Sequence, residues 1–265
     1  MSLPVTVRAA LIQLDCSTTQ DVATRTAQAL ATAERAAAEA DIVVLPELWH
    51  VGAFDVDAAR EHAQPIDGPL VSALSTLAAS HRTWIHGGSF CEIDSDGQHY
   101  NTTVLFAPDG ELVASYRKVH LFGFDGGETV LMSGGDELVV IDTPLGPTGL
   151  ATCYDLRFPE LFRALVEGGA TTFLIASGWP AQRIAHWEVL TQARAIENQA
   201  WLLACNEVGD QGGVRLGGRS VAVSPTGAVV AQADDREQVL FVDVDPDEAG
   251  RWRAEFPALE DIRIG

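Results

Sequence analysis

The stretch GLATCYDLRFPE, residues 149–160, joins an apolar segment to a helical one through a single cysteine, Cys153. Residues 148–153 predict a short buried strand, and Pro159 opens a predicted helix that Gly168 ends. A strand-to-helix elbow exposes the side chain at its apex and leaves the following backbone N–H groups free to bind negative charge. The stretch therefore predicts an α/β fold in which a thiol is well placed to act as a nucleophile.

Strands and helices extend from this elbow in both directions. Strands are predicted at residues 5–14, 41–45, 83–86, 100–107, 112–117, 148–153, 172–176, 201–205, 219–223, 229–233 and 238–244. Helices are predicted at residues 21–39, 70–81, 159–167 and 185–198. Gly87 and Gly88 should end the strand at 83–86, and residues 122–135, with Asp125 and Glu128, should form a loop. No stretch has the composition of an interdomain linker, so residues 1–265 are expected to form a single domain.

Two parts of the chain repeat one pattern. The helix ending at Glu39 leads into ADIVVLPE, residues 40–47, and the helix ending at Glu167 leads into ATTFLIASG, residues 170–178. In both, a helix and a tight turn precede an apolar strand, and a polar residue stands at or just past its end. The repetition favours two sheets packed against each other with helices outside.

The composition is that of a folded and strongly acidic protein. The 265 residues are 47% hydrophobic and 20% charged, which excludes general disorder. Lys and Arg number 17 against 37 Asp and Glu, and the net charge of −20 argues against nucleic-acid and anionic-membrane partners. No apolar run is long enough for a membrane helix, and the N-terminus lacks a secretory signal pattern, so a cytoplasmic location is expected.

Four cysteines, Cys16, Cys91, Cys153 and Cys205, lie far apart without a CxxC pair. This spacing matches neither a disulfide framework nor a zinc-ligand set, and no metal or organic cofactor is expected. Core packing is the usual fate of a cysteine, but Cys205 also ends a strand and is the second candidate nucleophile after Cys153. None of the seven histidines pairs obviously with Cys153, and spacing alone leaves a papain-like cysteine–histidine pair open.

Two charged residues stand at other strand ends. Glu47, in LPELW at residues 45–49, follows a buried strand, where α/β proteins place their sites, but taken alone it better fits a solvated loop glutamate. Lys118, in YRKVHLF at residues 116–122, has two equally good interpretations. It is either a half-buried lysine that needs an anionic partner or an edge-strand lysine that protects against aggregation. Together with Cys153, they indicate a carboxylate base and an ammonium that stabilises an oxyanion.

These three segments, in this order, resemble the signature segments of the nitrilase superfamily of carbon–nitrogen hydrolases, and the similarity extends over nearly the whole chain. The resemblance implies a four-layer αββα sandwich, usually dimerised through its outer helices, so a homodimer or higher homo-oligomer is expected. It implies that Cys153 is the nucleophile and Glu47 the general base. Lys118 and the backbone N–H of Tyr154 would stabilise the oxyanion while a small amide is hydrolysed through a cysteine thioester.

The family also uses a second glutamate between the lysine and the cysteine. Glu128, in GGETVLMSGGD at residues 126–136, matches that position best, and Glu137 is the fallback. The elbow carries three further residues that resemble those of the family, and structural ion pairs are expected at Asp155, Arg157 and Glu160.

The substrate should contact residues 177–199, SGWPAQRIAHWEVLTQARAIENQ, because this segment follows a strand end. The segment resembles the branch that contains omega-amidases, which hydrolyse the terminal amide of 2-oxo-dicarboxylic acid monoamides such as 2-oxoglutaramate. In this interpretation Trp179 walls the pocket and Arg183 or Arg157 binds a substrate carboxylate, although Arg183 alone also fits a solvated loop position. The alternatives are an amidase for deaminated glutathione or an N-carbamoyl compound, a nitrilase, and a catalytically silent binding or scaffold protein. The retained Glu, Lys and Cys argue against the last.

Overall fold

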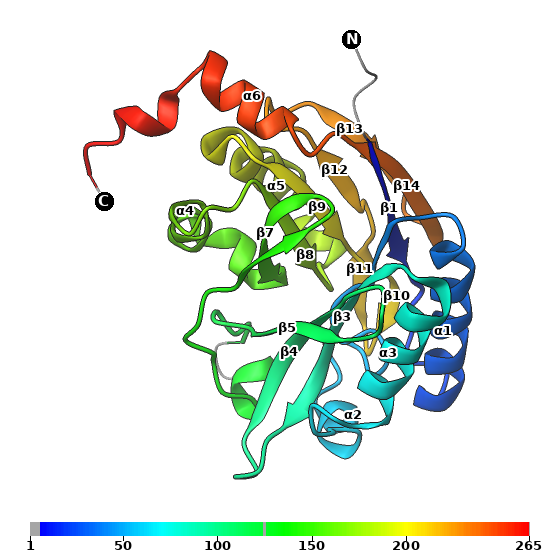
Figure 1. Ribbon diagram of the computed structural model, residues 1–265. Helices are drawn as coiled ribbons and strands as arrows, with labels where there is room; N and C mark the ends of the chain where they lie inside the picture. Colours follow the sequence, from blue (N-terminus) through cyan, green and yellow to red (C-terminus); the bar gives the residue numbers. More distant parts are fainter. Residues whose placement is uncertain (1–5, 124–125, 265) are drawn as a thin grey trace.

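Two six-stranded sheets packed against each other form the centre of the computed structural model, which describes residues 6–123 and 126–264 (Figure 1). In order, the first sheet contains β14 (Gln238–Val244), β1 (Val7–Gln13), β2 (Ile42–Val44), β3 (Trp84–Ile93), β4 (His99–Phe106) and β5 (Leu112–Arg117). The second contains β13 (Val229–Gln232), β12 (Val221–Val223), β9 (Trp201–Cys205), β8 (Thr172–Ala176), β7 (Gly146–Thr152) and β6 (Val140–Thr143).

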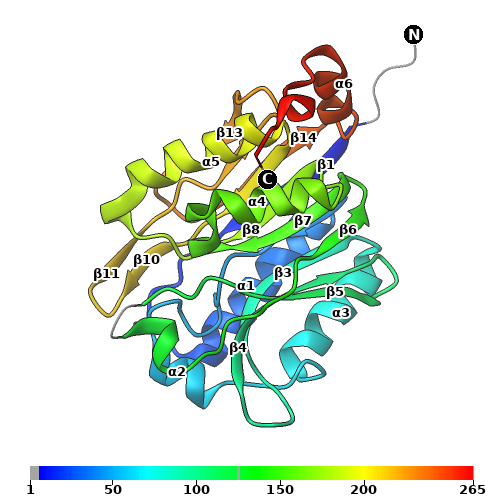
Figure 2. The ribbon, with the colours of Figure 1, turned by 90° about the vertical axis from the view of Figure 1, so that its left-hand side faces the viewer.

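Helices cover the outer face of each sheet (Figure 2). The first sheet is covered by α1 (Val22–Ala37) and α3 (Pro69–His81), and the second by α4 (Pro159–Glu167) and α5 (Ile184–Asn198). The four-layer αββα sandwich expected from the sequence is therefore confirmed. The smaller elements are the helices α2 (Val56–Glu61) and α6 (Glu248–Glu255) and the hairpin of β10 (Val208–Gln211) and β11 (Val214–Gly217).

The strand β2 and nearly all of β8 are apolar because both of their faces are covered. In β2, Val43 packs under the helices, whereas Ile42 and Val44 pack between the two sheets. In β8, Phe173 packs under the helices of the second sheet, whereas Leu174 packs between the sheets. A strand that is buried on two sides has no solvent-facing position for a polar residue, so its sequence reads as a continuous hydrophobic run.

The central strands of each sheet are parallel, so the residues that follow these strands lie at one edge of the sheet. β1, β2 and β3 run parallel in the first sheet, and β7, β8 and β9 run parallel in the second. Thr152, Ala176 and Cys205 are paired in register across the second sheet, so the residues that follow them emerge side by side. Polar residues after parallel strands are thereby gathered at their carboxyl ends, where α/β proteins bind ligands.

The prediction that Gly87 and Gly88 end the strand at 83–86 is wrong. β3 continues to Ile93, with an irregularity in its pairing with β4 between His86 and Ser89. Gly88 has a φ of +64°, and a bulge of this kind absorbs extra residues without ending a strand. The irregular part of β3 holds the segment that follows β2, because the Ser89 N–H donates to the Pro46 carbonyl at 3.1 Å.

Other boundaries differ by a few residues. Of the strand predicted at 5–14, β1 forms Val7–Gln13, and Val5 lies outside the described residues. The predicted loop at 122–135 contains a 3-10 turn, Gly127–Val130, and its Asp125 also lies outside the described residues. The sequence patterns did not predict α2, α6, β6, β10 and β11, all of which are eight residues or shorter.

Within the described chain, no helix combines the length and the apolar character that crossing a bilayer requires.

Substitution of Gly88 tests how tightly β3 holds the segment before Glu47. A Cβ on Gly88 would stand 1.9 Å from the Pro46 carbonyl oxygen, whereas one on Gly97, which also has positive φ, would meet nothing within 4 Å. We expect Gly97→Ala to lower the free energy of unfolding by about 1–2 kcal/mol through left-handed strain alone. Gly88→Ala should cost about 3 kcal/mol or more in urea denaturation, because backbone must also move. Equal losses in the two variants would contradict the close packing at Gly88.

Candidate active site

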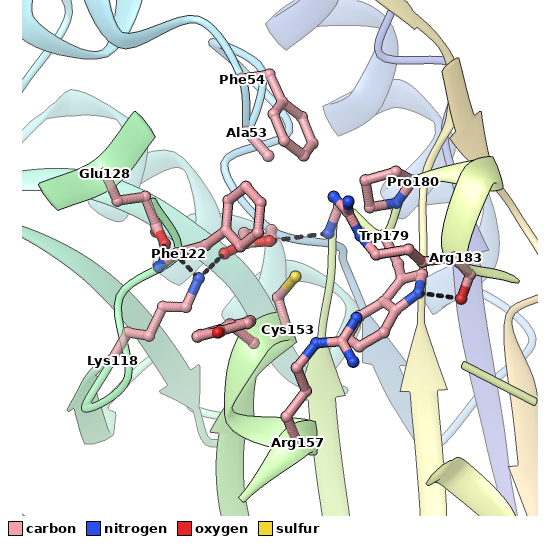
Figure 3. Close-up of a pocket in the computed structure, with 13 residues that line it drawn as sticks. Ala53, Phe54, Lys118, Phe122, Glu128, Cys153, Arg157, Trp179, Pro180 and Arg183 are labelled. Atoms are coloured by element: carbon pink, nitrogen blue, oxygen red, sulfur yellow. Dashed lines mark hydrogen bonds and ion pairs between the residues drawn. The ribbon is translucent and has the colours of Figure 1, made fainter. Parts of the chain in front are cut away.

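A pocket of about 370 Å³ opens at the carboxyl ends of the central strands (Figure 3). Cys153, Glu47, Lys118 and Glu128 all line it, although Glu47 and Cys153 are 106 residues apart in the sequence. Its remaining wall is made by Ala53, Phe54, Phe122, Tyr154, Arg157, Gly178, Trp179, Pro180 and Arg183. The structure thus brings together every site residue predicted from the sequence except the fallback, Glu137. Glu137 is exposed and lines a different hollow, beside Glu92 and Arg117.

The ammonium of Lys118 lies between two carboxylates. Its Nζ donates to Glu47 Oε1 at 2.7 Å and to Glu128 Oε2 at 2.6 Å, and all three side chains are at least 96% buried (Figure 3). Burial alone would lower the pKa of Lys118, but Glu128 and Glu47 more than offset this and hold the pKa well above its usual value. Lys118 is therefore a permanent cation at the floor of the pocket.

Backbone donors complete the coordination of the two glutamates. The Gly178 N–H donates to Glu47 Oε2 at 2.9 Å, and the Phe122 N–H donates to Glu128 Oε2 at 2.7 Å. Burial and the charge of Glu47 nevertheless raise the pKa of Glu128, because Lys118 is shared. One ammonium thus serves two buried carboxyls, which favours proton uptake by Glu128.

Asn101 is a site residue that the sequence patterns missed. It lies on β4, and its Nδ2 donates to Glu47 Oε1 at 2.8 Å and to Glu128 Oε1 at 2.5 Å. The Lys118 N–H donates to the Asn101 carbonyl at 2.8 Å, so this residue also positions the lysine backbone. An asparagine within a buried strand is unusual and was the available signal, but its partners could be identified only in three dimensions.

The Cys153 thiol stands at the elbow between β7 and a 3-10 helix, Cys153–Arg157. Its φ is +46°, an uncommon value for a residue with a side chain, and such strain is frequent at functional elbows. Burial and Glu47 raise the pKa of the Cys153 thiol well above its usual value, although Lys118 and Ser177 oppose them. The resting form is therefore the thiol, and a nearby base must accept its proton during attack.

The elbow is held by Asp155, which is completely buried. Its carboxylate accepts from the Thr152 N–H at 2.9 Å, from the Tyr116 hydroxyl at 2.8 Å and from the His120 N–H at 3.0 Å. The prediction of ion pairs at Arg157 and Glu160 is wrong. Within the part of the chain that the structure describes, Arg157 has no carboxylate partner and Glu160 has no cationic partner. Hydrogen bonds from strand ends, rather than arginine pairs, fix the elbow.

Two arginines face the pocket from the side opposite Lys118 (Figure 3). The guanidinium of Arg157 lies 4.6 Å from the centre of the Trp179 ring, and that of Arg183 lies 5.3 Å from the centre of the Phe122 ring. Burial lowers the pKa of Arg157, and the charge of Arg183, which lines the same pocket, acts in the same direction. Neither has a carboxylate partner in residues 6–123 and 126–264. An anionic group on a ligand would satisfy both.

The other three cysteines do not line the pocket. Cys205, the second candidate nucleophile, packs between the sheets, and its thiol donates to the Ile12 carbonyl at 3.1 Å. Cys16 and Cys91 are also fully buried, and burial raises the pKa of Cys91 to about 12. Among the described residues, no cluster of three or more His, Cys, Asp or Glu side chains is arranged to hold a metal ion.

The carbon–nitrogen hydrolase family model matches residues 8–254. The chain belongs to the carbon–nitrogen hydrolase family. A protein of Paenarthrobacter nicotinovorans named 2-oxoglutaramate amidase is 42% identical over 232 residues, which cover 85% of this chain and 79% of that relative. A protein of Dictyostelium discoideum named deaminated glutathione amidase is 34% identical over 84% of this chain and 83% of its own length.

A solved structure supports the same family assignment. The crystal structure of Saccharomyces cerevisiae Nit3, a member of branch 10 of the nitrilase superfamily, matches with a TM-score of 0.88. The match covers 98% of this chain and 97% of Nit3, at 31% sequence identity. The superfamily and the enzyme class predicted from the three sequence segments are confirmed, and this carbon–nitrogen hydrolase carries its buried lysine and carboxyls at the pocket described above.

Removal of the Lys118 charge should leave two buried carboxylates without a cation. We expect Lys118→Met to lower the free energy of unfolding by about 3–5 kcal/mol at neutral pH. Without the ammonium, the pKa of the two carboxyls would rise in the folded state, so the loss should be smallest at acid pH and grow as the pH rises. Urea denaturation at several pH values measures this dependence.

The exposed pair of Arg60 and Asp57 provides the control, because their side chains are 51% and 97% exposed. Arg60→Met should change the free energy of unfolding by less than about 1 kcal/mol at every pH. A loss in Lys118→Met that does not depend on pH would show that the two carboxyls are not held by the lysine charge.

Proposed function

We propose that the chain is an amidase that hydrolyses a small linear amide through a thioester on Cys153, with Glu47 as general base and Lys118 as an oxyanion donor. The observation that carries the proposal is the meeting of Glu47, Lys118 and Cys153 in one pocket, each buried and each from a different segment. A surface function needs no such arrangement, because burying these charges costs free energy unless they are paired.

Acylation begins with the proton of the Cys153 thiol. Glu47 accepts this proton while the sulfur attacks the amide carbon, so that a thiolate need not persist in the resting enzyme. Negative charge then develops on the amide oxygen and is stabilised by Lys118 Nζ and the backbone N–H of Tyr154. The second position of a helix has no intrahelical acceptor for its N–H, which leaves the Tyr154 donor free. Glu47 returns the proton to the departing ammonia, and the acyl thioester remains.

Deacylation repeats these steps with water. Glu47 accepts a proton from water, the hydroxide oxygen attacks the thioester carbon, and the same two donors stabilise the second oxyanion. Collapse of this intermediate breaks the C–S bond, the sulfur takes the proton back from Glu47, and the carboxylic acid product leaves. Glu128, tied to Glu47 through Lys118 and Asn101, positions the water and the amide nitrogen.

The arginines select the substrate in this proposal. Arg157 and Arg183 face the pocket without carboxylate partners in the described residues, and Trp179 walls it. Guanidinium groups bind carboxylates through charged hydrogen bonds, and a pocket walled by aromatic side chains such as Phe122 and Trp179 suits a small molecule. A short dicarboxylic acid monoamide such as 2-oxoglutaramate meets both conditions, in line with the name of the Paenarthrobacter relative.

The assembly and location are also proposals. Val189 and Ile196 on α5 are 65% and 54% exposed and lie two turns apart on one face of this outer helix, which supports a homodimer or higher homo-oligomer. All four cysteines are free thiols, which supports a reducing, cytoplasmic location. A single hydrolase domain that spans residues 1–265 is supported by the match over residues 8–254.

A panel of substrates tests the function. We expect ammonia release from 2-oxoglutaramate to exceed that from glutamine, an N-carbamoyl amino acid, deaminated glutathione and a simple nitrile. Intact-protein and peptide mass spectrometry of a rapidly quenched reaction should locate the acyl group on Cys153. Turnover of the nitrile alone would contradict the amidase assignment, and preference for another amide would change the substrate but keep the chemistry.

Variants assign the roles within the same assay. Cys153→Ala and Glu47→Gln should each lower kcat by about 10³-fold or more, whereas Cys205→Ala should keep most of the activity. Glu128→Gln should lower kcat by about 10²-fold through misplacement of the reacting groups. Unaltered turnover in Glu128→Gln would remove this residue from the mechanism, and an active Cys153→Ala would overturn the proposal.

Substitution of Arg157 or Arg183 should slow the hydrolysis of substrates that carry a carboxylate and leave that of neutral amides nearly unchanged. Arg157→Met and Arg183→Met are expected to lower kcat/KM for 2-oxoglutaramate by about 10- to 100-fold each, because a hydrogen bond to a charged group contributes about 1.5–3 kcal/mol. Hydrolysis of butyramide, which has no carboxylate, should change by less than about threefold in the same variants. Equal losses for both substrates would mean that the arginines support the fold of the pocket rather than bind a carboxylate.

A further inference from the structure

A third carboxyl, that of Glu207, lies beside the site and has no role in the mechanism above. Glu207 follows β9, and Gly178 follows the neighbouring parallel strand β8, so both emerge at the same edge of the second sheet. The Glu207 side chain is completely buried and does not line the pocket. Nothing in the amide chemistry requires a titratable group at this position.

Gly178 lies between Glu207 and Glu47. The Gly178 N–H donates to Glu47 Oε2 at 2.9 Å. A Cβ placed on Gly178 would stand 3.1 Å from Glu207 Oε2 and 3.5 Å from Glu47 Oε2. The two carboxyls therefore both lie close to one backbone position, and because both are buried, a charge on either acts strongly on the other.

Glu207 has few hydrogen-bond donors for a buried carboxylate. Gln211 Nε2 donates to its Oε2 at 3.0 Å, and Gln211 also accepts from the Phe54 N–H at 3.1 Å, which ties the carboxyl to the pocket wall. Its Oε1 has no hydrogen-bond partner among the residues that the structure describes. Burying an ionised carboxylate with an oxygen that accepts no hydrogen bond costs much free energy, whereas burying the protonated carboxyl costs much less.

The nearby cations are occupied by other groups. Arg25 uses its guanidinium to donate to backbone carbonyls of Ser17, Gln20, His50 and Val51. Lys118 is held by Glu47 and Glu128. Glu207 forms no ion pair within the described ranges.

The titratable groups that face Glu207 are Glu47 after β2, Cys16 after β1, Cys205 on β9 and Arg25 on α1. Burial raises the pKa of Glu207 well above its usual value, and Glu47 acts in the same direction, whereas Cys16, Gln211 and Arg25 oppose it. Geometry and surroundings agree that this carboxyl keeps its proton.

We propose that Glu207 is a positioning residue that packs against the Gly178 backbone beside Glu47 as an uncharged carboxylic acid, and that its ionisation at alkaline pH suppresses the Cys153 thiolate. The second part rests on the proposed function, in which Glu47 exchanges a proton with Cys153. A charge on Glu207 places a further anion behind Glu47 and opposes both the thiolate and the oxyanion. Glu207 thereby sets an upper pH limit on the reactivity of the site.

Melting temperatures test the protonation state without any substrate. An unfolded glutamate ionises near its ordinary pKa, so a buried neutral Glu207 contributes stability that is present in acid and is lost as the pH rises. The melting temperature of Glu207→Gln minus that of the wild type should therefore increase steadily between about pH 5 and pH 9. For Glu197→Gln, which removes a carboxylate paired with Arg194 at 2.7 Å, the difference should not increase.

Alkylation of Cys153 by iodoacetamide, followed by peptide mass spectrometry, tests the coupling to the thiol. Wild type and Glu207→Gln should react at the same rate at acid pH, and the variant should become several-fold faster at alkaline pH, where Glu207 ionises only in the wild type. Glu197→Gln should follow the wild type throughout. If these results hold and no amide is hydrolysed, the proposed function fails and the control of the thiol by Glu207 stands.

Other outcomes overturn the inference. Alkylation curves that coincide at every pH would mean that Glu207 does not act on the site, and curves that differ by one constant factor would mean that it is already ionised in acid. A melting-temperature difference that stays flat or falls with pH would also show a charged carboxyl. Should Glu207→Gln fail to fold, Glu207→Met provides a second neutral side chain. Failure of both beside a folded Glu207→Asp would show that the charge itself is required.

Discussion

The ammonium of Lys118, buried between Glu47 and Glu128, is the interaction on which the site depends. Burying three charged groups is unfavourable unless their partners are well aligned. Here the alignment is supplied by Asn101, which donates to both carboxylates, and by backbone N–H groups of Gly178 and Phe122. Since these donors come from both sheets and from the loop after β5, the charge cluster also fixes how the two halves of the sandwich meet at the pocket.

The fold explains why such distant residues converge. Parallel strands end at one edge of a sheet, and packing two sheets against each other brings two such edges together. The apolar runs of β2 and β8 fill the space between the sheets and beneath the helices, so that polar side chains are excluded until each strand ends. The rigid core therefore determines where Glu47 and Cys153 appear, and the loops contribute the surrounding wall.

Residues at the ends of predicted strands could be identified from the sequence, because a local pattern marks each strand end. Glu47, Lys118 and Cys153 each stand in such a place, and the central strands and covering helices were predicted on the same grounds. Asn101 and Glu207 were not identified, since their importance arises from partners distant in the sequence. The end of β3 was misplaced because Gly87 and Gly88 form an irregularity within a strand, and local composition does not distinguish this from a turn.

The distribution of charge around the thiol reconciles reactivity with stability. Burial and the neighbouring carboxyl of Glu47 keep the Cys153 thiol protonated, which protects it from oxidation and unspecific alkylation while the pocket is empty. In the proposed mechanism, Glu47 accepts the thiol proton at the moment of attack once an amide is bound. Lys118 would then bind a further anion, the developing oxyanion, close to the two carboxylates that it already holds. Arg157 and Arg183 lie across the pocket from Lys118, so the proposed mechanism separates the groups that would select an acidic substrate from the group that would stabilise its reacting amide.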